Sequence, residues 1–505
     1  MPELKHYTAP ATGLRQLQEL LPDAYSLQGC PGHRLQRRWL DSFDLRLEQA
    51  GLRCQLQQEG GVSELLLISR EDGKVLAASS VAGPPLLARD LPEGPLRDLL
   101  EPLLEVRALL EQADLETRVT PARICDRRGK TVARIQLETP FGEGLPSFLT
   151  LTPLRGYRKQ ARRIDRRLRR AEGVEVLAGE LLDTLLQWRG YCLYRPPAGL
   201  SGVVLEPEMA ANEALARLLL GLLAVMKANE AGILADLDSE FLHDFRVSLR
   251  RSRSLLGQVR GVFEERDLNR FGRELAWLAG ATSDKRDFDV FLLQFDQRAS
   301  LIGRGDRPAL EPLRRYLEQQ RTLAQGRLRR TLESRRYARF RQAWREWLEQ
   351  QAAQPARPPT ALESFSENTW RVYRKVLREG GAIDDSSPVE ALHELRKSCK
   401  KLRYLMEAGR SLYPPKRIRR AIAELKLLQD TLGAITDLDV QRSLLLRWEQ
   451  VLAKRGIPEE TIAAIEALRG VLGRQERKAR KRFARTFERF SERANRKRYR
   501  RLFRS

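Results

Sequence analysis

The C-terminal part of this 505-residue chain contains two copies of one sequence pattern. The block His-Asp-Phe-Arg at 243–246 returns as His-Glu-Leu-Arg at 393–396, which is 150 residues later. Two further blocks return with the same spacing: those at 287–290 and 335–340 recur at 437–440 and 485–490. Three blocks in one register predict a duplicated domain, and this feature constrains the fold more than any other.

The spacing of apolar residues changes along the chain. In the first ~150 residues apolar and polar positions alternate in short runs, which is typical of antiparallel strands. Examples of these runs are 63–68, 131–138 and 147–151, with turn residues at 71–74 and 126–130. A basic helical segment follows at 156–170, and the period stays helical from about residue 208 onward.

Three segments rich in Pro or Gly divide the chain: 195–199, 354–359 and 380–388. We therefore predict an α+β protein in which a β-rich, antiparallel N-terminal domain precedes an all-α, duplicated helical domain. The predicted boundaries are 1–195 for the β-rich domain, 205–355 for the first helical half and 360–505 for the second.

The net charge of +24 is concentrated in the helical part. Residues 1–200 carry 29 Lys and Arg against 26 Asp and Glu, which leaves 62 against 41 for residues 201–505. Such an excess is typical of a polyanionic partner: nucleic acid, an anionic membrane surface or a phosphate polymer. A solvated basic surface that favours solubility is the alternative.

Several function classes are not indicated. The five cysteines are scattered without a Cys-x-x-Cys pair, so neither a disulfide framework nor a zinc site is expected. The longest apolar run, 218–226, is shorter than the ~20 residues of a bilayer span, and residues 1–6 lack an apolar signal segment. There is no Walker loop, dinucleotide-binding glycine turn or nucleophile elbow. We expect a cytoplasmic protein that is not inserted in a membrane and has no catalytic residue, metal or cofactor.

Each copy of the repeat places a column of cations on one helix face, beside an apolar stripe. The columns consist of His243, Arg246, Arg250 and Arg253, and of His393, Arg396, Lys400 and Arg403. Like charges at this spacing cost about 0.2–0.5 kcal/mol per pair on an isolated helix, so an anion that lies against the column would relieve repulsion. We interpret the columns as one shared anion site. A capping or core role is the alternative for either histidine taken alone.

The third block adds a second basic helix to each half. Its candidate anion-binding residues are Arg330, Arg335 and Arg339, and Arg480, Arg485 and Arg489. A solvated charged helix is the alternative here. For the two Asp-x-Asp pairs, at 287–289 and 437–439, we favour helix capping or neutralisation of arginines over metal binding.

The pattern His-x-x-Arg-x-x-x-Arg-Arg-x-Arg at 243–253, followed by Arg-Asp-Phe-Asp-Val at 286–290, resembles the CHAD family, the conserved-histidine α-helical domain. The second copy fits the same family, with Thr436 where the first has Arg286. The resemblance covers about residues 205–505. It implies two helical bundles, related by a pseudo-twofold axis, around a basic pore or groove. It also implies that this pore or groove binds inorganic polyphosphate and that the protein is located on polyphosphate granules. The resemblance also implies that three further residues bind polyphosphate: Arg251, Lys397 and Lys401.

The N-terminal region resembles the CYTH, or triphosphate-tunnel, fold. The resemblance rests on residues 37–47, Arg107 and Leu-Arg-Gly-Tyr at 154–157. Enzymes of that family carry Glu-x-Glu-x-Lys on the first strand, where paired carboxylates hold a divalent metal. Here residues 1–5 read Met-Pro-Glu-Leu-Lys, with Glu3 alone, and Arg53 is the only basic residue of an expected pair. The resemblance therefore implies a tunnel domain without its metal site, and not an enzyme.

Three functions remain open on the sequence. Polyphosphate binding is our first hypothesis, with affinity that falls with salt and rises towards pH 6 as His243 and His393 become protonated. RNA or DNA binding is the second; the columns lack aromatic platforms, but Tyr337, Phe340, Phe487 and Phe490 lie on the second basic helices. A triphosphatase or polyphosphate-processing enzyme, acting through the N-terminal domain, is the third.

Overall fold

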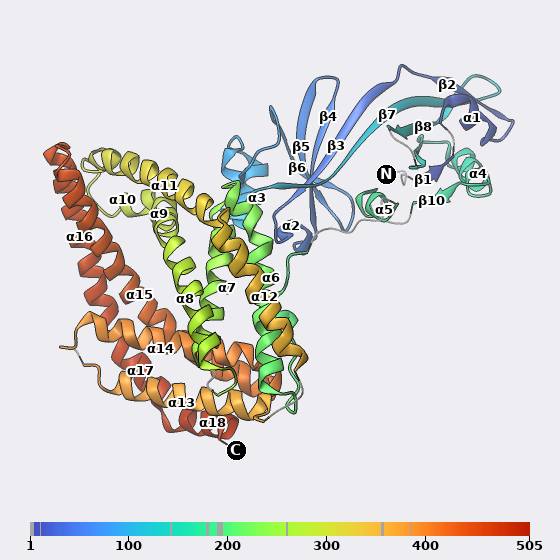
Figure 1. Cartoon of the computed structure of the whole chain (residues 1–505). Coiled ribbons are helices and arrows are strands. Elements are labelled where there is room, and N and C mark those ends of the chain that lie inside the picture. The colour runs from blue at the N-terminus through green and yellow to red at the C-terminus, as the bar shows by residue number, and fades with distance from the viewer. Residues whose placement is uncertain are drawn as a thin grey trace. The chain divides into compact units, whose positions relative to one another are not determined.

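The computed structural model describes residues 5–10, 12–141, 144–177, 181–188, 195–258, 261–354, 358–384 and 386–504. It forms two compact units, 1–196 and 197–505, which we call the sheet unit and the helical unit (Figure 1). The predicted α+β class is confirmed, because an antiparallel sheet precedes an all-helical region.

The sheet unit is built around one sheet of ten strands, in which all the observed pairings are antiparallel. Its strands are β1 (Lys5–Ala9), β2 (Tyr25–Gly29), β3 (His33–Asp41), β4 (Leu52–Glu59), β5 (Val62–Ser69), β6 (Val75–Ser80), β7 (Leu110–Asp126), β8 (Thr131–Pro140), β9 (Ser147–Pro153) and β10 (Glu175–Val176). The spatial order is β10-β1-β9-β8-β7-β3-β4-β5-β6, and β2 pairs with β7. The predicted runs at 63–68, 131–138 and 147–151 lie in β5, β8 and β9.

Alternation along the strands gives the sheet two different faces. Its helices are α1 (Leu14–Glu19), α2 (Arg46–Gln49), α3 (Pro95–Leu104), α4 (Arg158–Leu168) and α5 (Leu181–Trp188). On one face Cys54, Leu56 and Leu67 pack in a core with Leu100 of α3. Trp39, one position away from Leu40 of that core, points to the opposite face and packs against α5. One face of the sheet is thus covered by the core that includes α3, and α5 covers part of the other face.

The helical unit shows the predicted repeat in its helix boundaries. Its helices are α6 (Ala211–Leu234), α7 (Ser239–Gln258), α8 (Glu265–Ala281), α9 (Ser283–Leu293), α10 (Phe295–Ala299), α11 (Glu311–Leu332), α12 (Arg335–Ala353), α13 (Ala361–Gly381), α14 (Val389–Ala408), α15 (Pro415–Ala453), α16 (Glu459–Arg480), α17 (Phe483–Ser491) and α18 (Arg493–Phe503). Helices α6, α7 and α8 begin 150 residues before α13, α14 and α15. In Figure 1, α6, α7 and α8 run side by side.

The copies differ where α8 ends and α9 begins, since α15 continues through the equivalent position. The hydroxyls of Thr282 and Ser283 both donate to the Ala279 carbonyl, at 3.0 and 2.9 Å, which competes with the helical backbone pattern. The second copy has Leu432 and Gly433 there, and neither residue has a hydroxyl.

The two halves share a core at one end of the helical unit. Phe291 and Leu313 from the first half pack with Trp448 and Leu468 from the second. Within the first half, α6 and α7 approach closely at Gly232, where a Cβ would lie 2.3 Å from the Phe241 ring. No helix of the described residues is long and apolar enough to cross a membrane.

Candidate functional site

The two predicted cation columns lie on α7 and α14, which contact each other. An ion pair joins the helices, since Arg251 Nη2 donates to Glu407 Oε2 at 2.8 Å. The column side chains are partly buried except that of Arg253, which is exposed. Within the described residues, the predicted apolar stripes are buried core residues: Leu242, Phe245, Leu249 and Leu256 on α7, and Leu392, Leu395, Cys399, Leu402 and Met406 on α14. Val259, predicted for the first stripe, lies outside the described residues.

Cations of the two columns act on one another across this contact. Burial, followed by the positive charges of Arg396 and Arg250, lowers the pKa of Lys400 to about 8. Burial, followed by the charge of Arg250, lowers the pKa of Arg246 to about 10. We define the cationic cluster as His243, Arg246, Arg250, Arg286, Arg396, Lys400 and Arg403.

Arg250 and Lys400 occupy equivalent positions of the repeat, 150 residues apart. Arg250 on α7 therefore acts on its own repeat equivalent on α14. The Nε of Arg250 is buried and has no hydrogen-bond partner among the described residues. The centre of the cluster therefore holds repelling cations and an unused buried donor.

On the first half, Arg246 donates its hydrogen bonds to uncharged groups, and the carboxylate of Asp287 acts on it only through its charge. Its Nη1 donates to the Ala279 carbonyl at 3.2 Å, to Thr282 Oγ1 at 2.5 Å and to Ser283 Oγ at 3.3 Å. These acceptors lie at the break between α8 and α9, so this local difference between the copies positions a cation of the cluster.

His243 is bound by a cation that the sequence did not assign to the site. Arg286 Nη2 donates to His243 Nδ1 at 2.8 Å, which requires the neutral ring. Burial and the charge of Arg286 lower the pKa of His243. His243 therefore becomes protonated only below its ordinary range, which differs from the expected tightening towards pH 6. Arg286 belongs to the motif at 286–290, and its position in that motif was the sequence signal that could have identified it as a site residue.

On the second half, the equivalent side chains bind carboxylates. His393 Nε2 lies 3.0 Å from Asp439 Oδ2, and Arg396 Nη2 donates to Asp437 Oδ1 at 2.8 Å. Both acids lie on α15. The second Asp-x-Asp pair thus binds the first two residues of the column, and the pairing of Asp437 with Arg396 agrees with the predicted neutralisation of an arginine.

The other candidates of the columns have different surroundings. Arg403 Nε lies 3.3 Å from Glu407 Oε1, so this carboxylate binds two of the predicted residues, Arg251 and Arg403. Arg253 lines a separate hollow beside Phe263. Lys397 and Lys401 are also on α14; Lys397 is exposed and pairs with Glu394 at 2.7 Å, and Lys401 is partly buried.

The arginines of the second basic helices are not brought to the cluster by any contact among the described residues. Arg330, Arg335 and Arg339 are exposed on α11 and α12, as are Arg485 and Arg489 on α17. Arg489 pairs with Glu424 at 3.5 Å, and Arg480 donates to the Ser387 carbonyl before α14. Their role in binding stays a prediction.

The aromatic residues of the second basic helices are mostly core residues. The exposed fractions of Tyr337, Phe340 and Phe490 are 1%, 5% and 2%, and Phe487 is partly buried. Stacking of nucleic-acid bases requires accessible ring faces, so these residues do not supply the platform that the RNA hypothesis needed.

The first Asp-x-Asp pair includes a structural carboxylate. Asp289 is buried and accepts from Lys285 Nζ at 2.7 Å and from Arg321 Nε at 2.8 Å, and Asp236 binds both cations. Among the described residues no group of three or more His, Cys, Asp or Glu could hold a metal ion.

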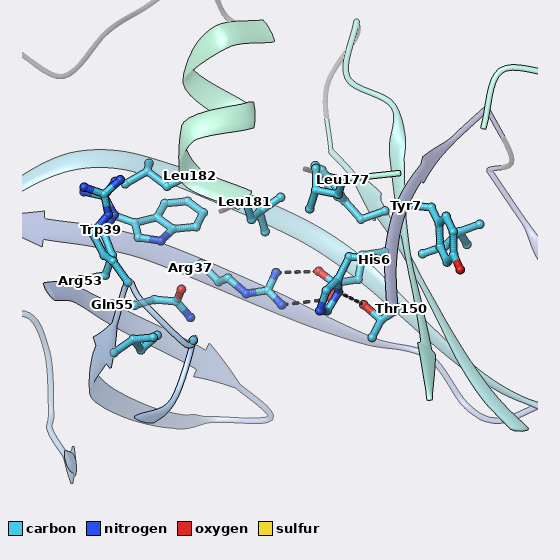
Figure 2. Close-up of a pocket in the computed structure, with 16 residues that line it drawn as sticks. His6, Tyr7, Arg37, Trp39, Arg53, Gln55, Thr150, Leu177, Leu181 and Leu182 are labelled. Atoms are coloured by element: carbon cyan, nitrogen blue, oxygen red, sulfur yellow. Dashed lines mark hydrogen bonds and ion pairs between the residues drawn. The ribbon is translucent and has the colours of Figure 1, made fainter. Parts of the chain in front are cut away.

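The sheet unit contains a cavity of about 460 Å³ on the face covered by α5 (Figure 2). Its lining includes His6, Arg37, Trp39, Arg53, Gln55, Ile68, Arg70, Glu138, Phe148, Leu149, Thr150, Leu177, Leu181 and Leu182. Register brings these distant positions together, since His6 on β1 is the partner of Thr150 on β9. His6 Nδ1 lies 3.1 Å from Thr150 Oγ1.

Glu138, which lines the cavity, and Asp183, which does not, are both bound to arginines. Arg37 Nη1 and Nη2 donate to Glu138 at 2.6 and 3.1 Å, the geometry of a bidentate pair. Asp183, on α5, accepts from Arg53 at 2.8 Å and from Arg70 at 3.2 Å. Glu3, on which the predicted loss of the metal motif depends, lies outside the described residues, whereas Lys5 binds Asp165 at 2.5 Å.

The fold and the cluster define a class of protein: a duplicated helical domain in which two columns of cations converge. The family model of the CHAD domain matches residues 217–446, so the helical unit contains a CHAD domain and that resemblance is confirmed.

Solved structures similar to the chain include the CHAD domain from the plant Ricinus communis, with 24% identity, coverage of 59% of this chain and 98% of that chain, and a TM-score of 0.49. PptA from Streptomyces chartreusis has 18% identity, covers 55% and 99%, and has a TM-score of 0.45. For the N-terminal region, HpAC1 from Hippeastrum, described with a dominant triphosphatase activity, has 12% identity, covers 38% and 98%, and has a TM-score of 0.29. No curated protein matches the chain.

Proposed function

We propose that the helical unit binds inorganic polyphosphate at the cationic cluster. The observation that carries the proposal is the packing of α7 on α14, which partly buries Lys400 near Arg396 and Arg250. Burial, followed by these two positive charges, lowers the pKa of the lysine to about 8. Such crowding is unfavourable in the free protein, and a polyanion between α7 and α14 relieves it. A phosphate chain offers only charge and oxygen acceptors, and guanidinium and ammonium groups recognise both.

The surroundings of the cluster favour polyphosphate over nucleic acid. The cluster itself contains no Phe, Tyr or Trp, and the aromatic rings of the second basic helices are mainly buried. Binding would therefore depend on charge and on salt, with little contribution from base stacking. Association with polyphosphate granules is part of this proposal.

The test is binding of labelled long-chain polyphosphate to wild type and to the variant Arg246→Gln, Arg250→Gln, Arg396→Gln, Lys400→Gln. We expect affinity to fall by about 10²–10³-fold, since each lost charged contact costs about 1 kcal/mol. The slope of log Kd against log salt should decrease by about 3. The matched control, Arg266→Gln, Arg304→Gln, Lys416→Gln, Lys454→Gln, removes the same charge from exposed positions.

Equal losses in the two variants would mean that affinity follows net charge alone and would remove the cluster from the proposal. RNA that displaces polyphosphate at equal phosphate concentration would favour general polyanion binding. Circular dichroism of both variants checks that the helices are retained.

We further propose that the sheet unit does not hydrolyse triphosphate. The support is that Glu138 and Asp183 already bind arginines. Metal-dependent release of phosphate from tripolyphosphate, abolished by Glu3→Gln, would contradict this.

A further inference from the structure

The cavity of the sheet unit has mainly apolar walls. Trp39, Phe148 and Leu182 are buried residues of one small core between the sheet and α5, and they also line the cavity. Ile68 and Leu181 extend this apolar wall. A cavity of about 460 Å³ is within the range of small-molecule sites, and such sites combine apolar walls with a few polar groups.

The charged side chains of the lining have partners. Arg53 and Arg70 bind Asp183 on α5, which does not line the cavity, and the remaining two bind each other. Arg37 and Glu138 form a bidentate pair, and their side chains are 13% and 7% exposed. A phosphate chain would bring several negative charges beside Glu138, or it would have to displace this carboxylate from Arg37. Removing one partner from a buried pair is costly, so the geometry disfavours inorganic polyphosphate here.

Groups that form hydrogen bonds without a charged partner also line the cavity. Figure 2 shows the Gln55 amide beside Arg37 and Trp39, with His6 and Thr150 at the far end of Arg37. The only hydrogen bond of the Gln55 side chain among the described residues is long, 3.4 Å to Gln57. This amide can therefore donate to and accept from a ligand.

We propose that this cavity binds an uncharged organic molecule with a flat apolar body and a hydrogen-bonding group such as a carbonyl. The apolar body packs between Trp39 and the leucines of α5, and Gln55 binds the polar group. The proposal concerns the sheet unit alone, so it holds or fails independently of polyphosphate binding by the helical unit.

The probe is the uncharged fluorescent dye 6-propionyl-2-(dimethylamino)naphthalene, which has an aromatic body and a ketone. The full chain should bind it with a blue-shifted emission, and tripolyphosphate should not displace it. Thr150→Trp places an indole in the cavity and should weaken binding roughly tenfold or more. Thr152→Trp is the matched control, because it is two residues along the same strand and does not line the cavity.

Gln55→Leu tests the polar contact and should weaken binding several-fold without loss of folding. Equal binding by Thr150→Trp and Thr152→Trp would overturn the proposal, and so would the absence of any dye binding by wild type. Displacement of the dye by tripolyphosphate would overturn it as well, and would assign the cavity to phosphate chains.

Discussion

Lys400 makes the pH dependence of polyphosphate binding predictable. In the free protein burial and neighbouring arginines lower its pKa from 10.5 to about 8. A bound polyanion reverses the electrostatic cause, so the pKa of Lys400 rises on binding and the complex takes up a proton. The affinity for polyphosphate is therefore highest below about pH 8 and falls as the pH rises through that value.

The size of the effect follows from the value of about 8. At pH 7 about nine tenths of the free lysine is charged, and at pH 9 about one tenth is charged. If the bound lysine stays charged, Kd rises about tenfold between pH 7 and pH 9, which corresponds to about 1.4 kcal/mol. Folding of the free protein shows the opposite sign: its stability rises with pH above about 8, because the unfolded chain then binds more protons.

Fluorescence anisotropy of labelled polyphosphate at pH 7, 8 and 9 and constant ionic strength measures this dependence. Lys400→Arg keeps the charge at every pH and should flatten the profile. Lys401→Arg, at the neighbouring position, should retain the tenfold change. A flat wild-type profile, or an equal slope in Lys400→Arg, would refute the reasoning.

Three further changes give measurable outcomes. Glu407→Gln releases two arginines from a carboxylate, and polyphosphate should bind about 3–10-fold tighter by anisotropy; unchanged affinity would exclude those arginines. Asp289→Asn leaves buried Lys285 without its full counter-charge and should cost about 3–5 kcal/mol in urea unfolding, and a loss below 1 kcal/mol would contradict the buried network. Gly232→Ala forces a Cβ against Phe241 and should lower stability by about 1–3 kcal/mol, whereas Gly257→Ala, with open space around it, should cost less than 1 kcal/mol.

Sequence periodicity predicted the fold class and the helix repeat because both are local signals. Each helix of the repeat carries its own apolar stripe, and equivalent helices begin 150 residues apart. The spacing also placed Arg250 and Lys400 at equivalent positions, although only the packing of α7 on α14 brings their charges together.

The features that the sequence could not predict are ion pairs between residues far apart in the chain. Arg37 and Glu138 are far apart in the chain, and only the register of the sheet makes them partners. Glu407 was not predicted to bind two cations of the columns, because its repeat equivalent is Gly257 and the pattern gave no signal. Both examples are electrostatic pairs between elements, and composition alone does not encode such pairs.

The two halves should contribute unequally to binding, because their equivalent arginines differ in their partners. Arg246 donates to hydroxyls and a carbonyl, whereas Arg396 donates to the carboxylate of Asp437. A phosphate that approaches Arg396 must compete with that carboxylate, so Arg246→Gln should weaken polyphosphate binding more than Arg396→Gln, by a further ~3–10-fold. Asp437→Asn should then strengthen binding more in wild type than in Arg396→Gln, where only its negative charge near Lys400 is lost. Equal losses for the two arginines would show that the Asp437 pair opens without cost, and that the duplication still works as a symmetric site.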